Sequence, residues 1–220
     1  MFITNYYCHS LQRARQANNS GQRYRIRVGS SLINPANFLP HYLNPQARAN
    51  FNFNFVPVAS SFLSANILFN NLGQHVDIVG DIYDQTLLNK YHCNAVKLAD
   101  LQFQIVCPFY SSLAQKAQLK PTDLAGQTVN IFYSPANSYL HEVRKVLKAV
   151  NCTVIEWPYL TSELFNSTND RQELAITTPL WHNLAPFSKV VPVDWQLTVP
   201  YGIIYSQKAP SIIQHFIDQL

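Results

Sequence analysis

Charged residues are scarce in this chain: they make up 13% of its 220 residues, against 47% hydrophobic ones. This balance excludes an intrinsically disordered chain, which needs more charge and less apolar surface. The chain also lacks the roughly 18 consecutive apolar residues that a membrane span requires. Its first residues, Met1 to Asn5, lack the basic and apolar regions of a signal peptide. We therefore expect a cytoplasmic, globular protein with a sizeable core.

Glycine, cysteine and histidine are too few or too scattered for most catalytic motifs. With six glycines the chain shows neither a phosphate-binding loop nor a nucleophile elbow. The four cysteines form no C-x-x-C pair, and the seven histidines fall in no H-x-x-x-H spacing. We expect no catalytic residue, no metal and no cofactor, although the adjacent His92 and Cys93 could in principle form a nucleophile pair.

Basic residues gather at the start of the chain. Five of the 16 Lys and Arg residues lie within the first 27 positions, where no Asp or Glu occurs. The remainder carries 11 basic and 12 acidic residues, so its net charge is −1. A neutral body argues against a groove for nucleic acid within it.

Apolar patterns arrange the first half of the chain as alternating strands and helices. We expect strands at 24–29, 51–58 and 76–80, and helices near 38–43 and 62–73, the latter ending at Gly73. This order favours a mainly parallel sheet covered by helices.

The second half continues in the same way. We expect strands at 103–107, 128–132, 152–155, 174–177 and 199–206, one helical turn at 121–124, and helices at 140–150 and 210–220.

The stretch from Phe103 to Gln127 combines several of these elements. Its apolar run ends at Pro108, and Asp123-Leu124-Ala125-Gly126 precedes the next strand. This pattern resembles the crossover between the lobes of the effector domain in LysR-type transcriptional regulators. In that family a strand and a Pro precede His-Pro-Leu-Ala and then Asp-Leu-x-Gly. Here Ser111-Ser112-Leu113-Ala114 takes the place of the His-Pro-Leu-Ala, and the resemblance extends from about Tyr24 to Leu220.

The resemblance implies the α/β, two-lobed fold of type 2 periplasmic binding proteins. It implies mixed, mainly parallel sheets with helices on both faces and two crossover segments, near 101–107 and 179–192. The implied parts are a linker and hinge arm at 1–22, lobe I at 23–106 and 190–220, and lobe II at 107–189. The DNA-binding domain that precedes the linker in this family is not in the sequence, so we expect a fragment of a longer regulator.

Hydroxyl-bearing turns follow four of the predicted strands, where helix N-termini present free N–H groups in α/β folds. These turns contain Ser30 and Ser31, Ser60 and Ser61, Ser134, and Thr177 and Thr178. For any one of these turns a helix N-cap is the more frequent role, and it is their convergence on one cleft in this fold that favours ligand contact. The resemblance implies that these residues line the ligand cleft together with Cys107 and Pro108. The polar segment 169–173 departs from the family, which often has a Gly-rich segment there.

The resemblance implies an effector-binding and oligomerisation domain that senses a small metabolite between its lobes. The implied assembly is a homodimer or homotetramer that reaches DNA only through the missing N-terminal domain and has no membrane partner. Our candidates for the subunit contact are the half-polar strand 51–58 and its flanking helices. No Lys or Arg lies at the cleft turns, so an anionic effector would depend on N–H groups and hydroxyls. Aromatic neighbours equally suit an apolar or aromatic molecule. The alternatives are a stand-alone solute-binding protein of this fold and an enzyme that needs His92 or Cys93.

Overall fold

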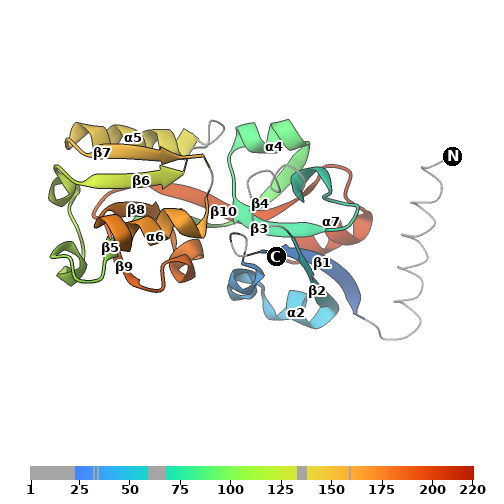
Figure 1. Cartoon of the computed structure of the whole chain (residues 1–220). Helices are drawn as coiled ribbons and strands as arrows, with labels where there is room; N and C mark the ends of the chain where they lie inside the picture. Colours follow the sequence, from blue (N-terminus) through green and yellow to red (C-terminus); the bar gives the residue numbers. More distant parts are fainter. Residues whose placement is uncertain (1–22, 32, 34, 59–67, 133–137, 159) are drawn as a thin grey trace.

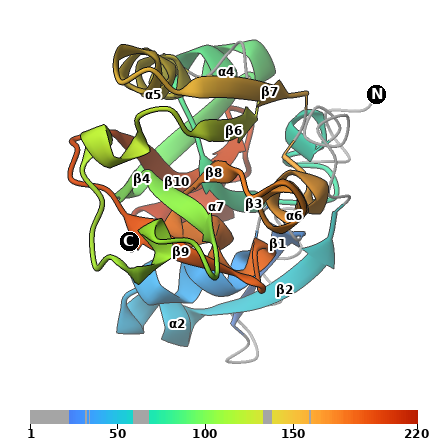
Figure 2. The same ribbon diagram turned by 60° about the vertical axis from the view of Figure 1, so that its left-hand side comes forward.

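The chain folds into two lobes that lie side by side, each built on a five-stranded sheet (Figures 1 and 2). The structure, a computed structural model, describes residues 23–31, 33, 35–58, 68–132, 138–158 and 160–220. No helix among these residues is long and apolar enough to cross a membrane. The predicted arm at 1–22 lies outside the described residues.

The first sheet has the strand order β2-β1-β3-β10-β4. It includes both the first and the last strand of the described chain. Its strands are β1 (Tyr24–Ser30), β2 (Phe51–Pro57), β3 (Ile78–Ile82), β4 (Cys93–Gln102) and β10 (Thr198–Ser206). β1 pairs in parallel with β2 and β3, whereas β10 runs antiparallel to β3 and β4. β1 and β3 therefore end at the same edge of the sheet, and that edge faces the second lobe.

Apolar side chains are buried on both faces of this sheet. On one face η1 (Ala36–Tyr42) and α7 (Ser211–Ile217) pack against β1 and β10, and α2 (Pro45–Asn50) leads into β2. On the other face α4 (Gln85–Tyr91) and residues 68–72 form a second cluster. Ile203 belongs to the first cluster and Ile204 to the second. Successive residues of β10 thus point to opposite, buried faces, as in a strand covered on both sides.

The second sheet has the order β7-β6-β8-β5-β9. Its strands are β5 (Gln104–Pro108), β6 (Thr128–Phe132), β7 (Thr153–Trp157), β8 (Leu174–Thr177) and β9 (Ser188–Pro192). Its helices and turns are η2 (Leu113–Gln115), η3 (Pro121–Leu124), α5 (Ser138–Ala149), α6 (Ser162–Arg171) and η4 (Pro179–Leu184). β6 runs parallel to β7 and β8, and β5 runs antiparallel to β8 and β9.

The chain crosses between the lobes twice, as predicted. Phe103 alone separates β4 from β5, and residues 193–197 connect β9 to β10. Gln102 Nε2 donates to the carbonyl oxygens of Val193 (3.0 Å) and Trp195 (2.8 Å). In return, Trp195 Nε1 donates to the carbonyl oxygen of Phe103 at 2.8 Å. The two crossing segments are therefore hydrogen-bonded to each other.

The two-lobed α/β fold class is confirmed, but details differ from the sequence prediction. Each sheet has two parallel and two antiparallel pairings, so the parallel share is smaller than expected. The return crossing follows residue 192, later than the predicted 179–192, because β9 pairs with β5 along its whole length. Residues 104–106 and 190–192, which we predicted in lobe I, consequently pair within the second sheet.

Candidate functional site

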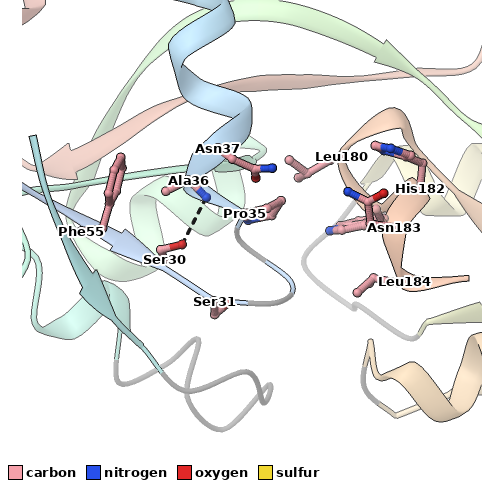
Figure 3. A pocket seen from close by; sticks show the side chains of 11 residues that line it. Ser30, Ser31, Pro35, Ala36, Asn37, Phe55, Leu180, His182, Asn183 and Leu184 are labelled. Atoms are coloured by element: carbon pink, nitrogen blue, oxygen red, sulfur yellow. Dashed lines mark hydrogen bonds between the residues drawn. The ribbon is translucent and has the colours of Figure 1, made fainter. Parts of the chain in front are cut away.

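A pocket of about 490 Å³ lies between the two lobes. One wall is formed by Ser30, Ser31, Pro35, Ala36, Asn37 and Phe55, and the other by Leu180, Trp181, His182, Asn183 and Leu184 of η4. Figure 3 shows the two groups facing each other. The first wall follows the end of β1 and the second follows the end of β8, so the pocket lies where strand ends of both sheets meet. Ligands bind at such edges in α/β folds.

Ser30 and Ser31, predicted as ligand contacts, do line this pocket. Ser30 Oγ accepts a hydrogen bond from the backbone N–H of Ala36 at 3.2 Å, at the start of η1 (Figure 3). Ser30 is not the N-cap of η1, which is Pro35, but its side chain binds the first residue of that turn. This bond leaves the hydroxyl proton of Ser30 available to a ligand, because a hydroxyl can donate and accept at once.

The η4 wall is anchored by Trp181, which the sequence analysis did not select. Its side chain is buried, and its ring meets that of Phe132 edge-to-face at 5.4 Å. Its Nε1 donates to the carbonyl oxygen of Ile33, in the segment after β1, at 2.9 Å. This bond joins the lobes beside the pocket. In the sequence, the position of Trp181 just after the predicted turn at Thr177 and Thr178 is the feature that could have indicated this role.

Asp84 forms a second bond between the lobes. It caps α4, where Oδ1 accepts from the Leu87 N–H at 2.9 Å. Its Oδ2 accepts from the backbone N–H of Ser138, the first residue of α5, at 3.0 Å. A carboxylate of the first lobe thus binds the start of a helix in the second. An Asp between a strand and a helix predicts the cap, but nothing in the sequence predicts the contact with residue 138.

Thr177 and Thr178 lie next to the pocket but do not line it. Both are fully buried at the end of β8, and Thr178 is the N-cap residue of η4. Thr177 Oγ1 donates to the carbonyl oxygen of Thr178 at 3.3 Å. Within the described part of the protein the Thr178 hydroxyl has no hydrogen-bond partner. These residues position the η4 wall.

Cys107 and Pro108 lie away from the pocket. β5 starts at the crossing and runs away from it into the second lobe. The last residues of β5 therefore lie about 10 Å from the crossing. Cys107 is fully buried, and burial raises the pKa of its thiol to about 12. Pro108 borders a different hollow together with Phe109, Tyr110 and Phe187. The remaining predicted contacts, Ser60, Ser61 and Ser134, lie outside the described residues.

The described residues of the pocket walls include no Lys, Arg, Asp or Glu, and His182 is the one imidazole among them. The imidazole Nδ1 lies 3.0 Å from the carbonyl oxygen of Pro179. Among the residues that the structure places, no group of three or more His, Cys, Asp or Glu side chains could hold a metal ion. The walls instead offer hydroxyls, side-chain amides and apolar surface. Such a lining can bind and orient a small molecule.

The possible nucleophile pair at His92 and Cys93 is not activated in this structure. His92 ends α4 in a left-handed conformation (φ 51°), and Cys93 is buried at the start of β4. Burial raises the pKa of the Cys93 thiol to about 11, so the thiol stays protonated near neutral pH. A catalytic cysteine needs the opposite shift.

Comparison with known proteins identifies the fold. No protein-family model and no curated protein matches the sequence. Among solved structures, the effector-binding domain of QuiR in complex with shikimate is similar over 90% of this chain and 95% of its own (TM-score 0.62, 12% identity). Full-length CbnR complexed with its target DNA is similar over 99% and 74% (TM-score 0.61, 15% identity). The Synechocystis CcmR regulatory domain in complex with 2-PG is similar over 88% and 94% (TM-score 0.56, 12% identity).

These similarities confirm the fold that the sequence predicted. The chain has the two-lobed, periplasmic-binding-protein-like fold found in the effector-binding domains of LysR-type regulators.

Proposed function

We propose that this chain is the effector-binding domain of a LysR-type transcriptional regulator, with the interlobe pocket as its effector site. One observation carries the proposal: the pocket is built from both lobes, at the strand ends that meet between them. QuiR and CcmR, which share the fold, were solved in complex with small molecules. The raised pKa of the Cys93 thiol argues against the alternative of an enzyme that uses this thiol as its nucleophile.

The proposed mechanism depends on contact with both walls. A ligand that touches Asn37 on one wall and Asn183 on the other binds most tightly at one lobe spacing. It therefore shifts the population of lobe arrangements by its difference in affinity between them. The proposed relay runs through the linker at residues 1–22 to a DNA-binding domain, in the cytoplasm.

Ligand binding is tested by thermal shift with a panel of metabolites, followed by Asn37→Trp. Asn37 is exposed on the pocket wall, so the indole fills the pocket without disturbing the core. A ligand at a hundredfold excess over Kd stabilises the protein by about 2.7 kcal/mol, and Asn37→Trp removes this stabilisation.

The matched control is Asn94→Trp, an exposed position on edge strand β4 that keeps the thermal shift. If every panel ligand stabilises Asn37→Trp as well as it does the unchanged protein, the site lies elsewhere.

We also propose that the domain forms dimers through β2 and the adjoining α2. β2 is an edge strand of the first sheet, and Asn52 and Pro57 are exposed on it. Edge strands leave backbone groups open to pairing. Light scattering coupled to size exclusion tests this assembly, and a monomer at high protein concentration contradicts it.

A further inference from the structure

In the described part of the chain, Asp84 is a charged residue whose side chain binds the start of a helix across the lobe boundary. Only 7% of the residue is exposed, and its two oxygens accept from Leu87 N at 2.9 Å and Ser138 N at 3.0 Å. The partial positive charge at the start of the 12-residue α5 is therefore already matched by a carboxylate of the protein.

This contact lies beside the pocket. The pocket walls follow β1 and β8, Asp84 follows β3, and Ser138 lies beyond the end of β6. β3 is the neighbour of β1 in the first sheet, and β6 is the neighbour of β8 in the second. The Asp84 contact is thus one strand away from the pocket in both sheets. Trp181 and Phe132, in contact edge-to-face, connect the two places.

Among the described residues that line the pocket there is no Lys or Arg to offset this nearby carboxylate. Lys97, which acts electrostatically on Tyr83, is paired with Asp100 at 2.7 Å. An anion in the pocket would lie near this buried negative charge, and the start of α5 is already bound by Asp84. Like charges close together in a protein interior disfavour each other.

We propose that the pocket selects an uncharged effector, a small ring or short aliphatic molecule with hydroxyl or amide groups, and that Asp84 sets this selectivity. The inference rests on the proposed effector site. Ser30, Asn37 and Asn183 supply donors and acceptors for such a molecule, and Phe55 and Leu180 supply apolar contact. Asp84 acts as a specificity residue by holding the position where a carboxylate would otherwise bind.

The test compares matched pairs of probes that differ in charge: shikimate with its methyl ester, and benzoate with benzamide. Dissociation constants are measured by isothermal titration calorimetry on the unchanged protein, Asp84→Asn and Asp84→Ser. Asn and Ser both keep a helix cap for α4, so the variants retain the fold while losing the charge. Asp218→Asn, at the end of α7, removes one negative charge far along the chain and is the control.

We expect the uncharged member of a pair to bind the unchanged protein and Asp218→Asn at least about tenfold more tightly. In Asp84→Asn and Asp84→Ser the acid gains affinity, and the preference falls below about threefold. An acid that binds the unchanged protein as tightly as its partner overturns the inference, as does a preference that survives both Asp84 variants. If no member of either pair binds, the proposed effector site itself fails, which is a distinguishable result.

Discussion

Arg27 and Asp77 show how one buried carboxylate joins two strands of the first lobe. Asp77 is 4% exposed and lies just before β3. Its side chain accepts from the backbone N–H of Arg27 at 2.8 Å, and from Nε and Nη2 of the same residue at 3.1 and 2.5 Å. β1 is therefore held to the start of β3 by bonds that depend on a negative charge at position 77.

Asp77→Asn is expected to lower the free energy of unfolding by about 2 to 3 kcal/mol, measured by urea denaturation. An amide cannot accept from all three Arg27 donors, and it leaves a partly buried guanidinium without its counterion. The control is Asp100→Asn, which breaks the half-exposed pair with Lys97 and should leave stability unchanged. Equal losses in the two variants would show that burial of Asp77 is irrelevant.

At the scale of a single element, β10 packs so closely against a neighbouring strand that one of its positions must be glycine. β10 lies between β3 and β4 in the sheet, and its register with β4 shifts between Tyr201 and Gly202. A Cβ at Gly202 would lie 2.2 Å from the backbone oxygen of Val96 and 2.9 Å from the Tyr83 ring. Only glycine fits at this position, because the obstructing atom belongs to the backbone and cannot rotate away.

Gly202→Ala is expected to cost about 3 kcal/mol of stability, since β4 must move away from β10. The comparison is Gly126→Ala, where a Cβ meets no atom within 4 Å but φ is +73°. That variant carries backbone strain alone and should lose about 1 kcal/mol. Thermal unfolding of both proteins checks the order, and a smaller loss at Gly202 contradicts it.

The elements predicted correctly from the sequence are those with uniform local signals. β6 and β8 match their predicted ranges, because each is a short apolar run bounded by polar or turn residues. β4 was missed because an edge strand with Asn94, Lys97 and Asp100 lacks a clean alternation. α6 was missed because its Ser, Thr, Asn and Asp residues favour caps and turns over helix interiors.

The site was predictable only where it follows from strand order. Ser30 and Ser31, which line the pocket, were selected because they follow a predicted strand. The Asp84–Ser138 bond joins residues 54 positions apart, and the Trp181–Ile33 bond joins residues 148 apart. Such contacts depend on the docking of two finished lobes, which no local pattern encodes.

At the scale of the whole molecule, the hydrophobic core of the second lobe continues into the first lobe. The largest cluster contains Ile82, Leu101 and Tyr201 from the first sheet together with most of the buried side chains of the second lobe. Because this cluster continues across the lobe boundary, we expect the described part of the chain to unfold as one unit.

Gln102→Ala should lower stability by about 1 to 2 kcal/mol, because it leaves the carbonyl oxygens of Val193 and Trp195 without their donor. The comparison is Gln214→Ala on the exposed side of α7, which should cost nothing measurable. Differential scanning calorimetry should show one transition in all three proteins. Two separated transitions in the unchanged protein would contradict a core that continues across the lobe boundary.

The position of β10 also determines the order in which the protein is completed during synthesis. The second lobe, from β5 to β9, is one continuous stretch and is whole once Pro192 has left the ribosome. β3 and β4 do not pair with each other and remain apart until β10 arrives between them. The first lobe, whose synthesis starts first, is therefore completed last. β3 and β4 keep unpaired edges while roughly the last tenth of the chain is still being translated.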